Sequence, residues 1–243
     1  MKILLIEPCF AGFLTAIYHA HYSHKDADII TSDLNAPSFL DIQVEITTDT
    51  VLAARVRSGI IKRAGTVIYS DIAHAYLSCQ DTKEKILFAY TKLVLLHGRA
   101  AYGMYQMNEV KEFNDLLQKV RGEAHRFKGF LRFKELKNGI YYSAFSGDND
   151  IIELLLPHFR ARMNAEKFVL HDIKRHKLIY YDSQICHYLI APEEYSVTLS
   201  DEEAFFSALW KDYHKNIAVE GRLNTDLQRQ CLPKKYRWFM NEF

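Results

Sequence analysis

The hydrophobic pattern of this 243-residue chain changes its period once, near His125, and no other sequence feature limits the fold as strongly. From Ile68 to His125 apolar residues recur at helical spacing, with breaks near residues 79–82 and 98–103. Beyond His125 apolar and polar residues alternate, as they do in strands with one buried face. This order predicts an α+β fold with a helical N-terminal half and a mostly antiparallel sheet of about five strands.

The second half is expected to begin with a β-hairpin. Residues 130–136 and 140–145 alternate on either side of Asn138-Gly139. This dipeptide is typical of a type I′ turn, in which both central residues need a positive φ. Three further strands and an inserted helix are predicted at residues 168–173, 178–181 and 185–190, and at 150–163, respectively.

The two ends of the chain add further elements. Short strands are expected over Lys2–Ile6 and Ile42–Ile46, with a helix from Phe10 to about His24 and another capped by Asp49. Ser200 and Glu203 form a capping box before a C-terminal amphipathic helix. Its apolar stripe, expected to pack against the body of the protein, is Phe206, Trp210, Tyr213 and Ile217.

These elements divide the chain into two halves. Residues 1–125 are expected to be mainly helical with short N-terminal strands. Residues 126–243 are expected to hold the antiparallel sheet, the inserted helix and a basic helical tail. Because no stretch has the composition of a linker, we expect the halves to form one compact unit.

Composition limits the class of protein. The chain is 49% hydrophobic and 25% charged, as folded globular proteins are. Its apolar runs are too short for a signal peptide or a membrane span, so we expect a cytoplasmic protein. Four widely spaced cysteines and the lack of familiar nucleotide-binding or hydrolase motifs predict no metal and no cofactor. They leave enzymatic activity open and favour a protein with no independent catalytic activity.

The net charge of +1 hides an uneven distribution. Residues 121–180 carry 12 Lys and Arg against 7 Asp and Glu, and residues 211–243 carry 7 against 4. Residues 181–210, between them, carry 6 acidic residues and no Lys or Arg. Positive stretches of this kind either contact phosphates or form an ordinary solvated face.

The positive stretches also contain aromatic residues, which suits a nucleic-acid interface because cations contact phosphates and rings stack on bases. We expect folding to gather these cations into one groove. The alternative is that the rings belong to the core and that the cations only stabilise helix C-termini. The predicted nucleic-acid-binding residues are Arg126, Lys128, Arg132, Arg160, Arg162, Lys174, Arg175, Lys215, Arg222, Arg229, Lys234, Lys235 and Tyr236.

Acid–base catalysis is a second hypothesis. The candidate groups are His125, His158, His171, Asp172 and Glu220. Adjacent residues of a strand point to opposite faces, so His171 and Asp172 are not expected to pair directly. An enzyme of this kind requires several of the five groups to converge in one pocket.

Several sequence blocks, in one order, carry a resemblance to a known family. They are Gly12–Ile17, Gly122–Phe133, Pro157–Phe159, His171–Arg175 and the tail from Glu220 to Tyr236. Over nearly its whole length the chain resembles a family of bacterial DNA-metabolism and DNA-repair proteins that contain a domain of unknown function. Members of that family are typically encoded beside a radical-SAM protein, and some are fused to a uracil-DNA-glycosylase-like domain.

The resemblance implies a role on DNA, without assigning catalytic residues. It favours a DNA-binding accessory or substrate-presenting subunit that works with a radical-SAM or glycosylase-type partner. Two alternatives remain open. The chain could itself be a DNA-processing enzyme with glycosylase-like or nuclease-like chemistry, or it could be a protein–protein scaffold that docks a partner through the acidic segment around 193–203.

Overall fold

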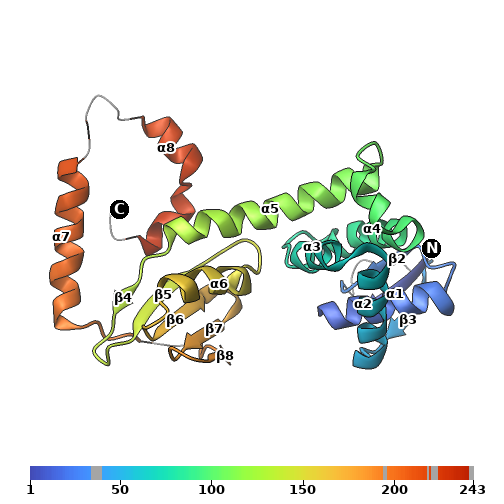
Figure 1. The fold of residues 1–243 in the computed structure, drawn as a ribbon, viewed down its shortest axis with the longest axis horizontal. Helices are drawn as coiled ribbons and strands as arrows, with labels where there is room; N and C mark the ends of the chain where they lie inside the picture. The colour runs from blue at the N-terminus through green and yellow to red at the C-terminus, as the bar shows by residue number, and fades with distance from the viewer. Residues whose placement is uncertain (34–39, 194–195, 218, 220–223, 241–243) are drawn as a thin grey trace. The chain divides into compact units, whose positions relative to one another are not determined.

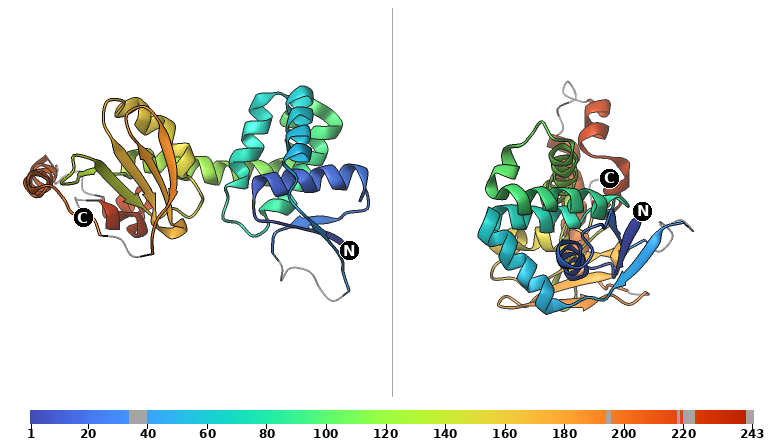
Figure 2. Two further views of the ribbon diagram at one scale, coloured as in Figure 1. Left: turned by 90° about the horizontal axis from the view of Figure 1, so that it is seen from below. Right: turned by 90° about the vertical axis from the view of Figure 1, so that its right-hand side faces the viewer.

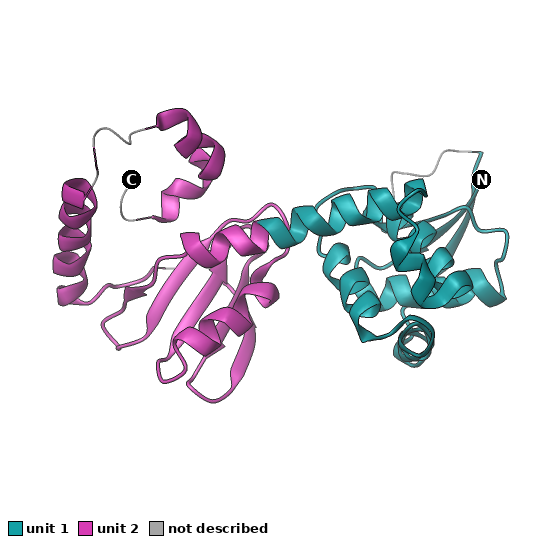
Figure 3. Ribbon diagram, turned by 45° about the horizontal axis from the view of Figure 1, so that its top comes forward, with its two compact units in different colours: residues 1–122 teal, residues 123–243 magenta. Residues whose placement is uncertain are grey.

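The computed structural model describes residues 1–33, 40–193, 196–217, 219 and 224–240. The chain divides into two compact units, residues 1–122 and residues 123–243, and each is described by itself (Figure 3). The predicted residues Glu220 and Arg222 lie outside the described part of the chain. Within that part, no helix is both long enough and apolar enough to cross a membrane.

Unit 1 begins with a three-stranded parallel sheet in the order β2–β1–β3. Its strands are β1 (Lys2–Ile6), β2 (Ile29–Thr31) and β3 (Ile42–Ile46). Helix α1 (Phe10–Tyr22) connects β1 to β2 and lies along the sheet (Figure 2). Parallel neighbours need such a crossover, because a tight turn cannot return the chain to the same end of the sheet.

The start of α1 depends on two small residues, Cys9 and Gly12. The Cys9 Sγ atom accepts a hydrogen bond from the Gly12 N–H at 3.3 Å, which satisfies one of the free donors of the first turn. A Cβ atom on Gly12 would lie 2.9 Å from the Glu7 carbonyl oxygen, closer than packed atoms tolerate. Glycine therefore allows α1 to begin directly after β1.

Helices form the rest of unit 1. They are α2 (Thr50–Ala64), α3 (Thr66–Tyr76), α4 (Lys83–His97), the short 3₁₀ helix η1 (Gly98–Gly103) and α5 (Asn108–Phe130), which continues into unit 2. The Asp49 carboxylate accepts hydrogen bonds from the Val51 and Leu52 N–H groups in the first turn of α2, which confirms the predicted cap. The predicted breaks at 79–82 and 98–103 are confirmed as well.

Unit 2 contains a five-stranded sheet in the order β4–β5–β6–β7–β8 (Figure 1). Its strands are β4 (Lys134–Glu135), β5 (Tyr141–Phe145), β6 (Phe168–Asp172), β7 (Lys177–Tyr181) and β8 (Cys186–Ile190). Only β5 and β6 pair in parallel, and α6 (Ile152–Arg162) connects them, while the other three pairs are antiparallel. The predicted α+β class and the five-stranded, mostly antiparallel sheet are confirmed.

The first predicted strand of unit 2 is mostly wrong. Helix α5 continues to Phe130, and β4 is only two residues long. The helix persists because the Phe127 ring packs in the core, 5.2 Å from Phe145 and 4.9 Å from Tyr236 between ring centroids. Burial of this ring outweighs the alternating pattern around it.

The turn between β4 and β5 also differs from the predicted type I′ turn. Of its two central residues only Gly139 has a positive φ, +73°. The Gly139 N–H donates to the Leu136 carbonyl, and the Leu136 N–H donates to the Ile140 carbonyl, both at 2.9 Å. This is a three-residue hairpin loop that ends in a left-handed glycine, the second common solution for such a connection.

The C-terminal part contains α7 (Asp201–Ile217), α8 (Thr225–Cys231) and the 3₁₀ helix η4 (Lys234–Phe239). Only half of the predicted capping box forms. The Ser200 hydroxyl accepts from the Glu203 N–H, but the Glu203 carboxylate accepts from the Glu135 N–H of β4. Helix α7 is therefore attached to the sheet through its first turn.

The predicted packing of the apolar stripe of α7 is wrong. Phe206, Trp210, Tyr213 and Ile217 are 40% to 57% exposed. Glu203 attaches the first turn of α7 to β4, and the stripe beyond it keeps at least 40% of its surface exposed. Instead, three of its rings line an open groove.

Candidate nucleic-acid interface

A groove of about 940 Å³ lies within unit 2, between α7 and the rest of the unit. The end of α5, strand β5 and α6 provide the opposite wall. Six aromatic residues line the groove: Phe133, Tyr141, Phe159, Phe206, Trp210 and Tyr213. Such a lining offers flat apolar surfaces to a planar ligand.

The aromatic residues of the groove fall into a fixed set and an accessible set. Phe133 meets Phe159 and Phe168 edge to face, at centroid distances of 5.1 and 5.7 Å, and these contacts fix its position. Trp210 and Tyr213 lie 5.7 Å apart on the α7 side, and each keeps 40% or more of its surface exposed. The accessible pair can therefore stack on a ligand while the fixed rings support it.

Cations border the same groove. Arg132, just after α5, and Arg162, in the last turn of α6, both line it. The Arg132 guanidinium donates to the Gly129 carbonyl at 2.7 Å and to the Leu131 carbonyl at 3.2 Å, which holds the guanidinium at the end of α5. The pKa of His158 is lowered, first by desolvation and then by the positive charges of Lys128 and Arg162, so Lys128 belongs to the same positive region.

Glu203 is the single acidic residue among the described residues that line the groove. Its carboxylate accepts from the Glu135 N–H at 3.0 Å and from the Ser207 hydroxyl at 2.8 Å. It also lies in the first turn of α7, where the helix dipole stabilises negative charge. These partners reduce its repulsion of an anionic ligand.

Three predicted cations are held by carboxylates elsewhere. Arg175 donates to Asp172 at 2.9 Å and to the Gly147 and Asp148 carbonyls. Lys235 pairs with Asp148. Arg229 pairs with Asp226 at 3.3 Å. Arg175 in particular fastens the loop after β5 to the loop after β6, a structural role.

Tyr236 is also a structural residue, because it is only 3% exposed. Its hydroxyl donates to Glu123 Oε1 at 2.9 Å. Glu123, itself 1% exposed, accepts three further hydrogen bonds, from the Asp148 and Asn149 N–H groups at 2.8 Å and from the Asn149 side-chain amide at 2.6 Å. The Tyr236 ring thus anchors the C-terminal segment and offers no face to a base.

The other predicted cations are spread over several elements. All of them are exposed: Arg126 on α5, Arg160 on α6, Lys174 on η2 (Ile173–Arg175), Lys215 on α7 and Lys234 on η4. The Arg160 guanidinium lies 5.4 Å from the centre of the Tyr181 ring. Of the predicted residues, Arg132 and Arg162 line the groove and Lys128 lies near them.

The acid–base candidates lie in different surroundings. His171 and Asp172 occupy opposite faces of β6, because Nδ1 of His171 is hydrogen-bonded to the Tyr142 hydroxyl at 2.6 Å while Asp172 pairs with Arg175. Burial lowers the pKa of His171, with His176 contributing, and burial raises the pKa of Asp172 against the opposing effect of Arg175. His125 is exposed on α5, and His158 lies near the groove.

No group of three or more His, Cys, Asp or Glu side chains in the described ranges is arranged to hold a metal ion. The groove residues that sequence reasoning missed are Phe206, Trp210 and Tyr213, which were expected to be buried. The spacing of these rings is that of any amphipathic helix, so no signal in the sequence separates them from core residues.

Residues 81–242 match the family described as a domain of unknown function, DUF4130. The chain belongs to this family. The DUF4130 match contains α4, α5 and nearly all of unit 2, so every residue that lines the groove lies inside it. The sheet β2–β1–β3 and helices α1 to α3 precede it. No curated protein matches the chain.

Proposed function

We propose that the DUF4130 region binds single-stranded nucleic acid in the groove between α7 and the body of unit 2. The observation that carries the proposal is the combination of the accessible Trp210–Tyr213 pair with the guanidinium groups of Arg132 and Arg162 in one open groove. Bases stack on such rings and phosphates follow the cations. Stacking contributes about 1–3 kcal/mol per base.

A single strand fits these features better than a duplex. The bases of a duplex are stacked on one another and present only their edges in the grooves. Access to the flat faces of Trp210 and Tyr213 requires unpaired bases. The proposed ligand is therefore a single-stranded or locally opened segment.

DNA is the proposed nucleic acid, on the basis of the resemblance to DNA-metabolism and DNA-repair proteins. In this proposal the chain is an accessory subunit that holds opened DNA for a radical-SAM or glycosylase-type partner. The groove supports such a role because its aromatic rings can stack on bases and its arginines can contact phosphates, which is sufficient to hold DNA while the partner performs the chemical step.

Fluorescence anisotropy with labelled oligonucleotides tests the proposal. Single strands should bind more tightly than a duplex of equal length, with a logarithmic salt slope of about −0.7 per phosphate contacted. Trp210→Ala and Arg162→Glu should each weaken binding, whereas Trp210→Phe should retain most of it because the ring remains. Lys111→Glu, on an exposed position of α5 in unit 1, is the matched charge reversal and should have little effect on this groove.

Two results would count against the proposal. One is the absence of salt-dependent binding below about 10 µM, since even non-specific DNA binding reaches this range at physiological salt. The other is equal weakening by Arg162→Glu and Lys111→Glu, which would indicate attraction to the net charge of the chain and no defined site.

A further inference from the structure

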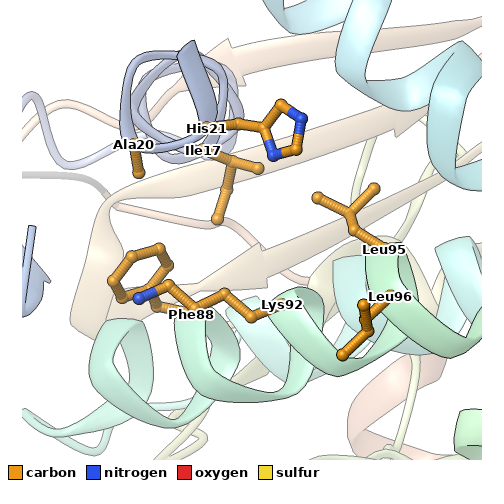
Figure 4. Close-up of a pocket in the computed structure, with 7 residues that line it drawn as sticks. All are labelled: Ile17, Ala20, His21, Phe88, Lys92, Leu95 and Leu96. Carbon is orange, nitrogen blue, oxygen red and sulfur yellow. The ribbon is translucent and has the colours of Figure 1, made fainter. Parts of the chain in front are cut away.

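Unit 1 contains two adjoining pockets around α1. One, of about 290 Å³, lies between α1 and α4 (Figure 4). The other, of about 380 Å³, lies between α1 and α2. Ile17, His21 and Leu95 line both pockets, so together they form one groove, which we call the α1 groove.

The floor of the α1 groove is apolar and its rim is aromatic. Ile17 and Phe88 in the floor are each 3% exposed, so core packing fixes them. At the rim, the ring centroids of Tyr18 and Tyr22 lie 4.6 Å apart, and His21 meets Tyr22 edge to face at 4.8 Å. Tyr22 is 57% exposed, which leaves a flat ring accessible beside an apolar floor.

Four cations and no carboxylate are among the described residues that line the α1 groove. They are Arg55, Lys62, Arg63 and Lys92. The Lys92 amine lies 3.9 Å from the centre of the Phe88 ring (Figure 4). The Arg55 guanidinium lies 5.7 Å from the centre of the Tyr18 ring. These amine and guanidinium groups are thus placed directly beside the aromatic surfaces.

Stabilisation of helix ends explains only part of this cluster. Lys62 and Arg63 lie in the last turn of α2, where positive charge is favourable in any protein. Arg55 and Lys92 lie in the interior of α2 and α4, where that effect is absent. The Lys92 amine donates to the Ala27 carbonyl at 3.4 Å, and burial lowers its pKa against the opposing effect of Asp28.

We propose that the α1 groove is a second site for single-stranded nucleic acid, with bases against Tyr18, His21 and Tyr22 and phosphates at Arg55 and Lys62. The absence of acidic lining residues selects an anionic ligand, and the accessible rings select one with flat apolar faces. Most of this groove precedes residue 81 and so lies outside the DUF4130 match. The site is independent of the groove in unit 2.

Photochemical crosslinking maps the two sites separately in the full chain. A short oligonucleotide containing 5-iodouracil, which crosslinks to adjacent aromatic side chains, is irradiated with the protein and the modified peptides are identified by mass spectrometry. The expected result is crosslinking within residues 18–22, in addition to crosslinking within residues 206–213 from the unit 2 groove. The double variant Arg55→Glu/Lys62→Glu should lose the first set and keep the second.

The reciprocal variant separates the two proposals. Arg162→Glu/Trp210→Ala should lose crosslinks within 206–213 and keep those within 18–22. Arg55 and Lys62 are exposed, so their replacement leaves the core intact, which circular dichroism verifies. Loss of two phosphate contacts should reduce the magnitude of the salt slope of unit 1 binding by about 1.4.

Three outcomes would overturn the second site while leaving the first intact. The first is wild-type crosslinking that is confined to residues 206–213. The second is crosslinking within 18–22 that Arg55→Glu/Lys62→Glu leaves unchanged. The third is displacement of the oligonucleotide from unit 1 by a polyglutamate peptide of equal charge at equal concentration, which would indicate a site for acidic protein segments.

Discussion

Removing the Tyr236 hydroxyl should lower the free energy of unfolding of unit 2 by about 2 kcal/mol, because the lost hydrogen bond ends on a buried carboxylate. In Tyr236→Phe the ring still packs against Phe127, whose centroid lies 4.9 Å away. Glu123, 1% exposed, keeps the Asp148 and Asn149 donors but loses the Tyr236 donor at 2.9 Å. Hydrogen bonds to charged groups contribute about 1.5–3 kcal/mol.

Urea unfolding followed by tryptophan fluorescence measures this change in the relevant unit. Both tryptophans of the chain, Trp210 and Trp238, belong to unit 2, so the signal reports on that unit alone. Tyr188→Phe is the matched control, since Tyr188 is 61% exposed. The control should stay within about 0.5 kcal/mol of the wild type.

A Tyr236→Phe variant as stable as the control would refute the structural assignment of Tyr236. The same variant also distinguishes the structural role from the one predicted from sequence. A ring that only stacks on bases would leave the free energy of unfolding unchanged in Tyr236→Phe, whereas the anchor described above should lose stability in unit 2.

Three further perturbations have defined outcomes. Arg175→Ala should destabilise unit 2 by about 3 kcal/mol or more in urea titrations, because it leaves the buried Asp172 carboxylate without its cation, and adding Asp172→Asn should restore part of the loss. Gly98→Ala should lower the free energy of unfolding by about 2–3 kcal/mol, because Gly98 has φ +59° and ψ −137° and a Cβ atom there would lie 2.9 Å from the Arg63 carbonyl oxygen. Gly59→Ala, where a Cβ atom meets nothing, should instead raise the free energy of unfolding by about 0.5–1 kcal/mol, as thermal unfolding measures. Burial lowers the pKa of His171, so the unfolded chain binds a proton at this side chain at a higher pH than the folded chain does. The free energy of unfolding should therefore fall as the pH drops below about 6.5. Urea titrations over a series of pH values should show a smaller fall in His171→Gln.

Much of the fold follows from local patterns. Local sequence predicted the Asp49 cap, the breaks at 79–82 and 98–103 and the strands from β5 to β8, because each of these features depends on neighbouring residues. The end of α5 was not, because Phe127 is held in a helix by Phe145 and Tyr236, which are distant in sequence. Tertiary packing decided that boundary against the local alternation.

The site was harder to predict than the fold. Charge counts drew attention to residues 121–180 and 211–243, yet Arg175 and Lys235 in these ranges are paired with Asp172 and Asp148. The Arg175–Asp172 pair is local and the Lys235–Asp148 pair joins distant segments, and a charge count over a range shows neither of them. The first 120 residues are nearly neutral, with 12 basic and 13 acidic residues, and this balance concealed the cluster in the α1 groove.

The exposed face of α7 illustrates the same limit. The spacing of Phe206, Trp210 and Tyr213 is that of any amphipathic helix, and burial is the usual fate of such a stripe. Only the attachment of Glu203 to the Glu135 N–H shows that the helix is held at its start. Sequence periodicity predicts which face of a helix is apolar, whereas the element that packs against this face is known only from the structure.

The emission of Trp210 tests the proposed function most directly. In a Trp238→Phe chain, Trp210 is the only tryptophan, and it lines the groove with 40% of its surface exposed. Titration with a single-stranded oligonucleotide should quench this emission in a saturable way, with the same midpoint as the anisotropy change and with weaker binding at higher salt. Emission that stays constant through the concentration range in which anisotropy reports binding would show that the strand binds elsewhere and would contradict the account.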